Sequence, residues 1–150
     1  MIKVAVAGGF DPLHSGHVEH ILKAGKLGDW LVVILTRDAQ LVMKKGYCHQ
    51  PLNRRIEIIR SELIGIVNEI VVNKDVGTIE CAETLRLVKP NIFAKGGDWT
   101  EQNLPKAEVK ACRDIGCRII FGVGNKVDAD GKKLSSQSIV SAVLNSIYNE

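Results

Sequence analysis

The segment IKVAVAGGFDPLHSGH, residues 2–17, decides the fold of this chain. Its apolar beginning predicts a strand, and the adjacent glycines Gly8 and Gly9 predict a turn. His14 and His17 follow at the start of an apolar-periodic segment that predicts a helix. A strand, a glycine-rich turn and a helix start together direct backbone N–H groups and the positive end of a helix dipole at one point. The segment therefore predicts a phosphate site, to which the two imidazoles add donors.

Predicted strands and helices alternate along the rest of the chain. The continuous apolar run at 30–36 is typical of a parallel strand buried on both faces. The other strands are expected at 2–7, 68–72, 91–95 and 118–121, and the helices at 16–27, 52–65, 78–88 (with Thr78 as its cap), 105–115 and 135–148. This rhythm predicts one domain over residues 1–150 with an α/β fold: a Rossmann-like, doubly wound, parallel five-stranded sheet with helices on both faces.

Composition excludes several classes of protein. The formal net charge of the 150 residues is +3, and most basic residues are scattered among acids, which disfavours a nucleic-acid partner. No apolar run approaches the ~20 residues that span a bilayer, and the first residues lack the layout of a signal peptide, so no membrane association and a cytoplasmic location are expected. The four cysteines form no C-x-x-C pair and are expected to be reduced thiols.

The residues of the predicted phosphate site have defined expected roles. Gly8, Gly9 and Gly16 let a ligand approach the backbone closely. The rings of His14 and His17 can hydrogen-bond phosphate oxygens, and protonation would add charge. An alternative is a zinc site built from these two histidines with His20 and a cysteine, although the spacing matches no common zinc motif.

The sequence over 9–17, Gly-Phe-Asp-x-x-His-x-Gly-His, resembles the G-x-F-D-x-x-H-x-G-H motif of the cytidylyltransferase-like nucleotidylyltransferases. Further matches follow in the family's order at 26–33, 36–38, 51–55, 89–99 and 134–139, so the resemblance covers nearly the whole chain. The Lys-Gly-Gly-Asp-Trp stretch at 95–99 is most similar to the heptose-1-phosphate adenylyltransferase domain, with glycerol-3-phosphate cytidylyltransferase next. Archaeal-type FAD synthetases share the first motif.

The resemblance implies an activity, a set of site residues and partners. AMP or CMP would pass from ATP or CTP, accompanied by Mg²⁺, to a phosphorylated sugar or polyol, with heptose 1-phosphate favoured, and pyrophosphate would leave by in-line attack without a covalent intermediate. A homodimer is also expected. The catalytic residues implied are His14, His17 and Lys44; the nucleotide-binding residues are these histidines with Gly8, Gly9, Phe10, Asp11, Gly16, Gly96, Asp98, Trp99, Ser135, Ser136 and Gln137; the acceptor-binding residues are Asp38, Lys44, Lys45 and Arg55. No residue is expected to bind a metal directly.

Each of these assignments has a plainer alternative. Lys44 and Lys45 are expected in a flexible segment that folds over the triphosphate, or else form a solvated basic pair. Arg55, at a helix start, needs an anionic partner or is a surface residue. Residues 96–99 could be only a turn, Ser135 and Ser136 only a helix cap, and 122–133 either a lid or a surface loop. For the whole chain, the alternatives are an FAD synthetase-like enzyme and a non-catalytic nucleotide-binding protein.

Overall fold

The computed structural model describes residues 1–124; the helix predicted at 135–148 and the assigned residues Ser135, Ser136 and Gln137 lie outside this range. The elements are β1 (Lys3–Gly8), α1 (Ser15–Gly25), β2 (Trp30–Leu35), α2 (Asp38–Lys45), α3 (Leu52–Glu62), β3 (Glu69–Val72), α4 (Ala82–Val88), β4 (Ile92–Ala94), α5 (Lys106–Ile115) and β5 (Arg118–Ile120). All pairings are parallel, and the strand order is β3-β2-β1-β4-β5. The predicted α/β fold with a five-stranded parallel sheet is confirmed.

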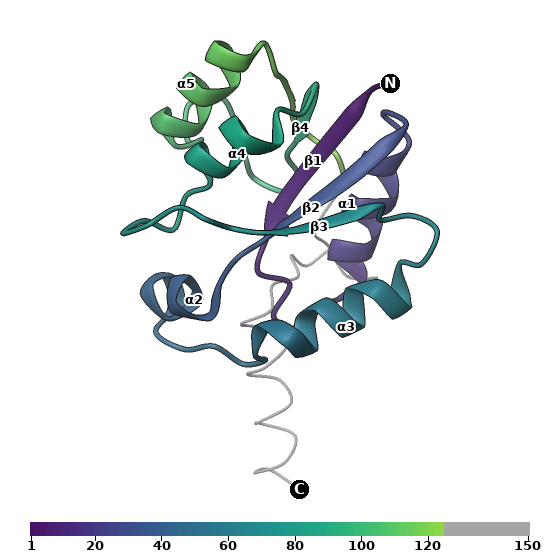
Figure 1. Ribbon diagram of the computed structural model, residues 1–150, viewed down its shortest axis with the longest axis vertical. Helices are drawn as coiled ribbons and strands as arrows, with labels where there is room; N and C mark the ends of the chain where they lie inside the picture. The colour runs from purple at the N-terminus through teal and green to yellow at the C-terminus, as the bar shows by residue number, and fades with distance from the viewer. Residues whose placement is uncertain (125–150) are drawn as a thin grey trace, which may run out of the picture.

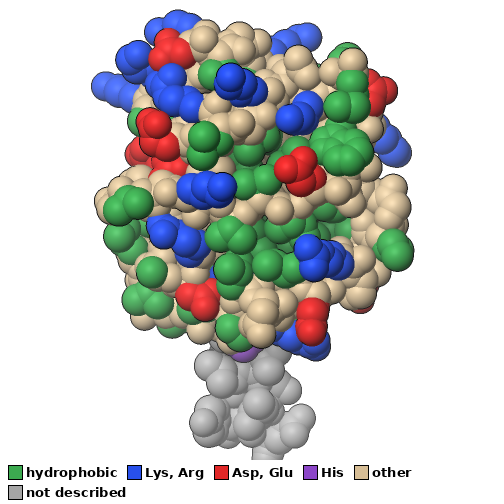
Figure 2. All heavy atoms as spheres, in the orientation of Figure 1, with side chains coloured by type: hydrophobic (Ala, Val, Ile, Leu, Met, Phe, Trp, Pro, Cys, Tyr) green, Lys and Arg blue, Asp and Glu red, His purple; other side chains and the backbone are tan. Residues whose placement is uncertain are grey.

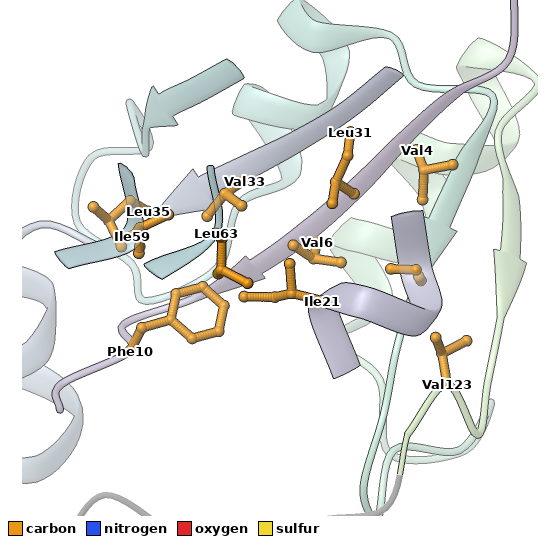
Figure 3. Packing of buried hydrophobic residues seen from close by; sticks show 12 residues of the cluster. Val4, Val6, Phe10, Ile21, Leu31, Val33, Leu35, Ile59, Leu63 and Val123 are labelled. Carbon is orange, nitrogen blue, oxygen red and sulfur yellow. The ribbon is translucent and has the colours of Figure 1, made fainter. Parts of the chain in front are cut away.

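Two apolar clusters cover the two faces of the sheet, as expected when helices pack on both sides. On β2, Leu31, Val33 and Leu35 face α1 and α3, whereas Val32 and Ile34 face α4 and α5. Figure 1 shows these two helix layers on either side of the strands. Figure 3 shows the first cluster, in which the Phe10 ring extends the core beyond the end of β1. The core therefore anchors the backbone that leads into the histidine pair.

Helix α2 corrects the prediction of a flexible segment after β2. Only Gln40 and Leu41 of this helix are buried, so its sequence has too little apolar periodicity to indicate a helix. Its ends supply the stabilisation instead: the Gln40 side chain accepts the Arg37 N–H, and Gly46 ends the helix at φ 85°. Lys44 and Lys45 lie in its last turn, where cations interact favourably with the helix dipole.

Helix α4 begins at Ala82, so Thr78 is not its cap. The hydroxyl of Thr78 instead accepts the N–H of Glu80, within the preceding loop. The Asp75 carboxylate accepts the N–H groups of Glu83 and Thr84 at 2.9 Å each. A residue in the loop after β3 thus satisfies N–H groups in the first turn of this helix, which local sequence does not reveal.

The surface in Figure 2 carries Lys and Arg side chains interspersed with Asp and Glu. This mixture agrees with the scattered basic residues of the sequence. Across residues 1–124, none of the helices combines the length and apolar character needed to cross a membrane.

Candidate active site

The candidate site lies where the direction of chain progression through the sheet reverses. From β1 the chain moves outward through β2 to β3, and it then crosses to β4 on the other side of β1. Ligands of open parallel α/β sheets bind beyond the carboxyl ends of the strands at such a switch point. The segment that carries His14 and His17 leaves β1 at this position (Figure 1).

His14 and His17 cap helix α1 reciprocally. Nδ1 of His14 accepts the N–H groups of Gly16 at 3.1 Å and His17 at 3.3 Å, while Nδ1 of His17 accepts the N–H of His14 at 3.3 Å. The two rings stack with centroids 3.5 Å apart and an interplanar angle of 20°. Both side chains are buried. The pair is therefore a rigid unit built into the start of α1, with the three-residue spacing of a capping box.

These hydrogen bonds decide which nitrogen of each ring carries the proton. A ring nitrogen that accepts an N–H cannot itself be protonated, so each Nδ1 bears a lone pair and the neutral ring carries its proton on Nε2. Each imidazole can thus present an Nε2–H donor. The structure differs here from the sequence expectation, because three backbone N–H groups expected to face phosphate are bonded to the rings and the donors are ring N–H groups.

The glycines before the pair serve packing within the protein. A Cβ on Gly9 would lie 2.6 Å from Leu41 Cδ2, and a Cβ on Gly8 would lie 3.0 Å from the Phe10 ring. The protein's own side chains therefore fill the Cβ direction of each glycine, while both residues stay partly exposed and their contact with the nucleotide stays a prediction. The Phe10 ring meets His17 edge-on, with centroids 5.0 Å apart, so the packing at Gly8 also supports the histidine pair.

Asp11 ties two loops together. Its buried carboxylate accepts the N–H groups of His49 at 2.7 Å and Gln50 at 2.5 Å, and lies 3.8 Å from the Lys45 ammonium. Lys45 also donates to the Asp11 carbonyl at 3.2 Å. Burial lowers the pKa of Lys45, the largest influence on it, while Asp11 acts in the opposite direction. The solvated-pair alternative is therefore wrong for Lys45, whereas Lys44 is exposed.

Arg55 is fully buried, so the surface alternative is wrong. Its guanidinium donates to the carbonyls of Gln50 at 2.9 Å, Gly9 at 3.0 Å and Thr36 at 2.6 Å, and to the Asp38 carboxylate at 2.6 Å. The anionic partner that its helix-start position requires is Asp38, whose side chain is 48 % exposed. These contacts give Arg55 a positioning role: they hold the ends of β1 and β2 and the start of α2 together. Contact of Arg55 or Asp38 with an acceptor stays a prediction.

The loop after β4 packs directly against α1. A Cβ on Gly96 would lie 2.7 Å from the Val123 carbonyl oxygen and 2.8 Å from His20 Nδ1, so only glycine fits there. His20 Nδ1 lies 2.5 Å from the Val123 carbonyl oxygen, and because that oxygen only accepts, the ring nitrogen donates. His20 thus joins the histidine helix to the segments after β4 and β5. The sequence pattern suggested His20 only as a zinc ligand and gave no sign of this role.

Residues 96–99 form a turn that places Trp99 over a buried cation. The N–H of Trp99 donates to the Gly96 carbonyl at 3.4 Å, and Asp98 is held by an Asn103 side-chain hydrogen bond to its carbonyl. The Lys95 ammonium lies 4.4 Å from the Trp99 ring centroid and 4.9 Å from that of Phe93. Cation–π contact thus fixes Trp99 near the carboxyl end of β4. Lys95 is a further site residue that was not predicted from the sequence. Nucleotide contact by Asp98 and Trp99 stays a prediction.

Within residues 1–124, no three His, Cys, Asp or Glu side chains are grouped so as to hold a metal ion. The zinc alternative with His14, His17 and His20 finds no donor set in that range. The carboxylates of the described site, Asp11 and Asp38, are instead held by backbone N–H groups and by the cations Lys45 and Arg55.

Comparison with known proteins assigns the family. A model of the family described as cytidylyltransferase-like matches residues 5–142, so the chain belongs to this family, which is one of nucleotidyltransferases. The bifunctional protein HldE of Hahella chejuensis is 33 % identical over 124 residues, which are 81 % of this chain. The chain spans only 23 % of the length of that relative.

Two further relatives differ in their stated roles. An FAD synthase of Pyrococcus horikoshii is 35 % identical over 100 residues, covering 65 % of this chain and 64 % of its own length. The crystal structure of a lipopolysaccharide core biosynthesis protein from Thermoplasma volcanium superposes with a TM-score of 0.65 at 27 % identity, covering 85 % of this chain and 99 % of that one. The family is therefore defined, and the relatives differ in what their names say they make.

Proposed function

We propose that this protein transfers AMP or CMP from ATP or CTP to a phosphorylated sugar or polyol and releases pyrophosphate. The observation that carries the proposal is the stacked His14–His17 pair at the switch point, with Nδ1 of each ring used by the backbone. Two preorganised ring N–H donors suit phosphate oxygens whose negative charge grows during transfer. Membership of the cytidylyltransferase-like family supports the same chemistry.

The reaction needs no protein nucleophile. An oxygen of the acceptor phosphate attacks the α-phosphorus of the nucleotide, and the bond from that phosphorus to the bridging oxygen breaks as pyrophosphate leaves. Catalysis of this step is mostly positioning and charge stabilisation. His14 and His17 donate to the oxygens that gain charge, while the exposed Lys44 neutralises the triphosphate or the acceptor phosphate. Mg²⁺ enters with the triphosphate, since phosphate oxygens and water are its usual ligands.

Heptose 1-phosphate is the acceptor we favour. The HldE relatives and the lipopolysaccharide core biosynthesis protein support an acceptor of this class. The FAD synthase relatives favour a second candidate, in which FMN accepts AMP from ATP. Homodimer formation and a cytoplasmic location stay predictions.

A pyrophosphate-release assay tests the proposal directly. ATP and CTP are each paired with heptose 1-phosphate, other sugar 1-phosphates, glycerol 3-phosphate and FMN. Release that depends on both the nucleotide and a sugar or polyol phosphate supports the proposal, and release only with ATP and FMN supports the second candidate. Nucleotide binding without release with any acceptor would identify a non-catalytic binding protein and overturn both.

Variants of His17 separate its capping role from its donor role. His17→Asn can keep an acceptor near the position of Nδ1 and loses the Nε2–H donor, whereas His17→Ala loses both. We expect kcat of His17→Asn to fall by about 10² or more, since one preorganised donor contributes about 3 kcal/mol, with little change in thermal stability. His49→Ala, a substitution at an exposed histidine, is the control. Near wild-type turnover of His17→Asn would refute the mechanism.

A further inference from the structure

Two cysteines meet at the end of α5, away from the histidine pair. Gly116 ends this helix at φ 70°, and the N–H of Cys117 donates to the carbonyl of Cys112 at 2.8 Å. This bond across six residues is the Schellman motif, whose geometry brings together the side chains at its two ends. Helix termination therefore places the Cys112 and Cys117 thiols side by side.

A pocket opens onto this pair. It has a volume of about 340 Å³, and its lining includes Cys112, Arg113, Cys117 and Phe121. Cys112 is 1 % exposed and Cys117 is 9 % exposed, and the pocket they line offers a reagent a route to them. The volume exceeds the ~30 Å³ occupied by a water molecule, and a molecule little larger than water can enter.

The two sulfurs have different acid–base properties. The Cys117 side chain beside it lowers the pKa of Cys112, although burial acts in the opposite direction, and the Cys117 thiol donates to the Arg118 carbonyl at 3.7 Å. The neighbouring Cys112 and burial raise the pKa of Cys117. The thiolate is the nucleophilic form of cysteine, so Cys112 is suited to react first.

We propose that Cys112 and Cys117 form a peroxide-sensitive dithiol, oxidised to an intramolecular disulfide by hydrogen peroxide or a small organic hydroperoxide. The Cys112 thiolate attacks one peroxide oxygen, the O–O bond breaks, and the leaving hydroxide or alkoxide takes up a proton. Cys112 becomes a sulfenic acid that keeps one peroxide oxygen, and the other oxygen leaves as water or as an alcohol. The Cys117 sulfur then attacks Cys112, the S–O bond breaks, water leaves and the S–S bond forms.

The other two cysteines serve as internal controls with opposite properties. Cys48 is more exposed than Cys112, and burial raises the pKa of its thiol. Cys81 is buried beside Glu108, and burial raises its pKa well above the ordinary value. If exposure alone decided reactivity, Cys48 would react first, whereas the proposal requires the buried pair to do so.

The test treats the full chain with hydrogen peroxide, blocks remaining thiols with iodoacetamide and digests with trypsin under non-reducing conditions. Trypsin cleaves after Lys110, Arg113 and Arg118, so Cys112 and Cys117 fall on separate peptides, 111–113 and 114–118. A disulfide joins these peptides into one species that reductant separates. We expect this species to form about tenfold faster than any oxidation of Cys48.

Single variants distinguish the sulfur that attacks the peroxide from the sulfur that closes the disulfide. Cys117→Ser is expected to accumulate the Cys112 sulfenic acid, which dimedone traps, whereas Cys112→Ser is expected to give neither the linked peptide nor a trapped adduct at Cys117. Absence of the linked species in the wild-type chain, or oxidation of Cys48 before the pair, overturns the proposal. The proposal is also overturned if the disulfide forms only between two copies of the chain, which a non-reducing gel detects as a dimer.

Discussion

Substitution of Arg55 tests whether this residue organises the site. Its side chain is entirely enclosed and donates to three backbone carbonyls and to Asp38. Arg55→Lys keeps the charge, but an ammonium cannot reproduce the planar fork that reaches all four acceptors. Arg55→Ala leaves every one of them without this partner. The neighbouring Arg54→Ala removes an exposed ion pair with Glu57 and is the matched control.

The burial and the number of the partners of Arg55 set the expected losses in unfolding free energy. Removing one partner of a buried charged pair costs about 3–5 kcal/mol, and each buried acceptor left unsatisfied costs about 1–3 kcal/mol. Because Asp38 is 48 % exposed and can be rehydrated, we expect about 4 kcal/mol for Arg55→Ala and about 2–3 kcal/mol for Arg55→Lys. Since the free energy of unfolding of a domain is about 5–15 kcal/mol, these losses would remove a large share of it. Arg54→Ala should cost less than about 0.5 kcal/mol.

Urea unfolding followed by tryptophan fluorescence measures these differences. With a slope of about 2 kcal/mol/M, Arg55→Lys should lower the midpoint by about 1 M or more. Its kcat should also fall, because the ends of β1 and β2 lose their common anchor. Arg55→Lys and Arg54→Ala could instead unfold at the same urea concentration, with a rise only in the KM of Arg55→Lys for the acceptor. In that case Arg55 contacts the acceptor as a ligand, and the positioning role is refuted.

Two further predictions concern stability. Burial raises the pKa of Glu108 against the opposing charge of Lys95, so Glu108 contributes stability that is present below its ordinary pKa and is lost as pH rises through its folded-state pKa. Glu108→Gln should therefore flatten the decline in unfolding free energy above pH 4.5, measured by urea unfolding across pH; an unchanged slope would contradict this. Gly96→Ala should cost about 1–3 kcal/mol, because its Cβ would overlap the Val123 carbonyl and His20. Gly25→Ala, whose Cβ would make only ordinary contacts at 3.6 Å, should be neutral or slightly stabilising in thermal melts, and equal melting temperatures for the two variants would contradict the packing argument.

Elements with strong local signals were predictable from sequence. The apolar run of β2 and the apolar segment leading into the histidines sufficed to predict parallel strands and the helix that starts at the histidine pair. The helix expected at 105–115 is confirmed as α5 (Lys106–Ile115). Helix α2 was missed, because its buried face consists of only Gln40 and Leu41. A helix stabilised mainly at its ends leaves little periodic signal in its sequence.

The amino-acid sequence by itself determined the alternation of strands and helices and the position of the histidine pair, since both arise from patterns within a few residues. Only the tertiary structure decided what the charged and polar groups of the site contact. Arg55 bonds to Gly9, 46 positions away, and Asp11 bonds to backbone groups 38 and 39 positions away. A buried polar group must find partners wherever the fold places them, and no local pattern records that choice. For the same reason, the histidines were expected to add donors beside free backbone N–H groups, and the structure makes each ring the partner of those groups.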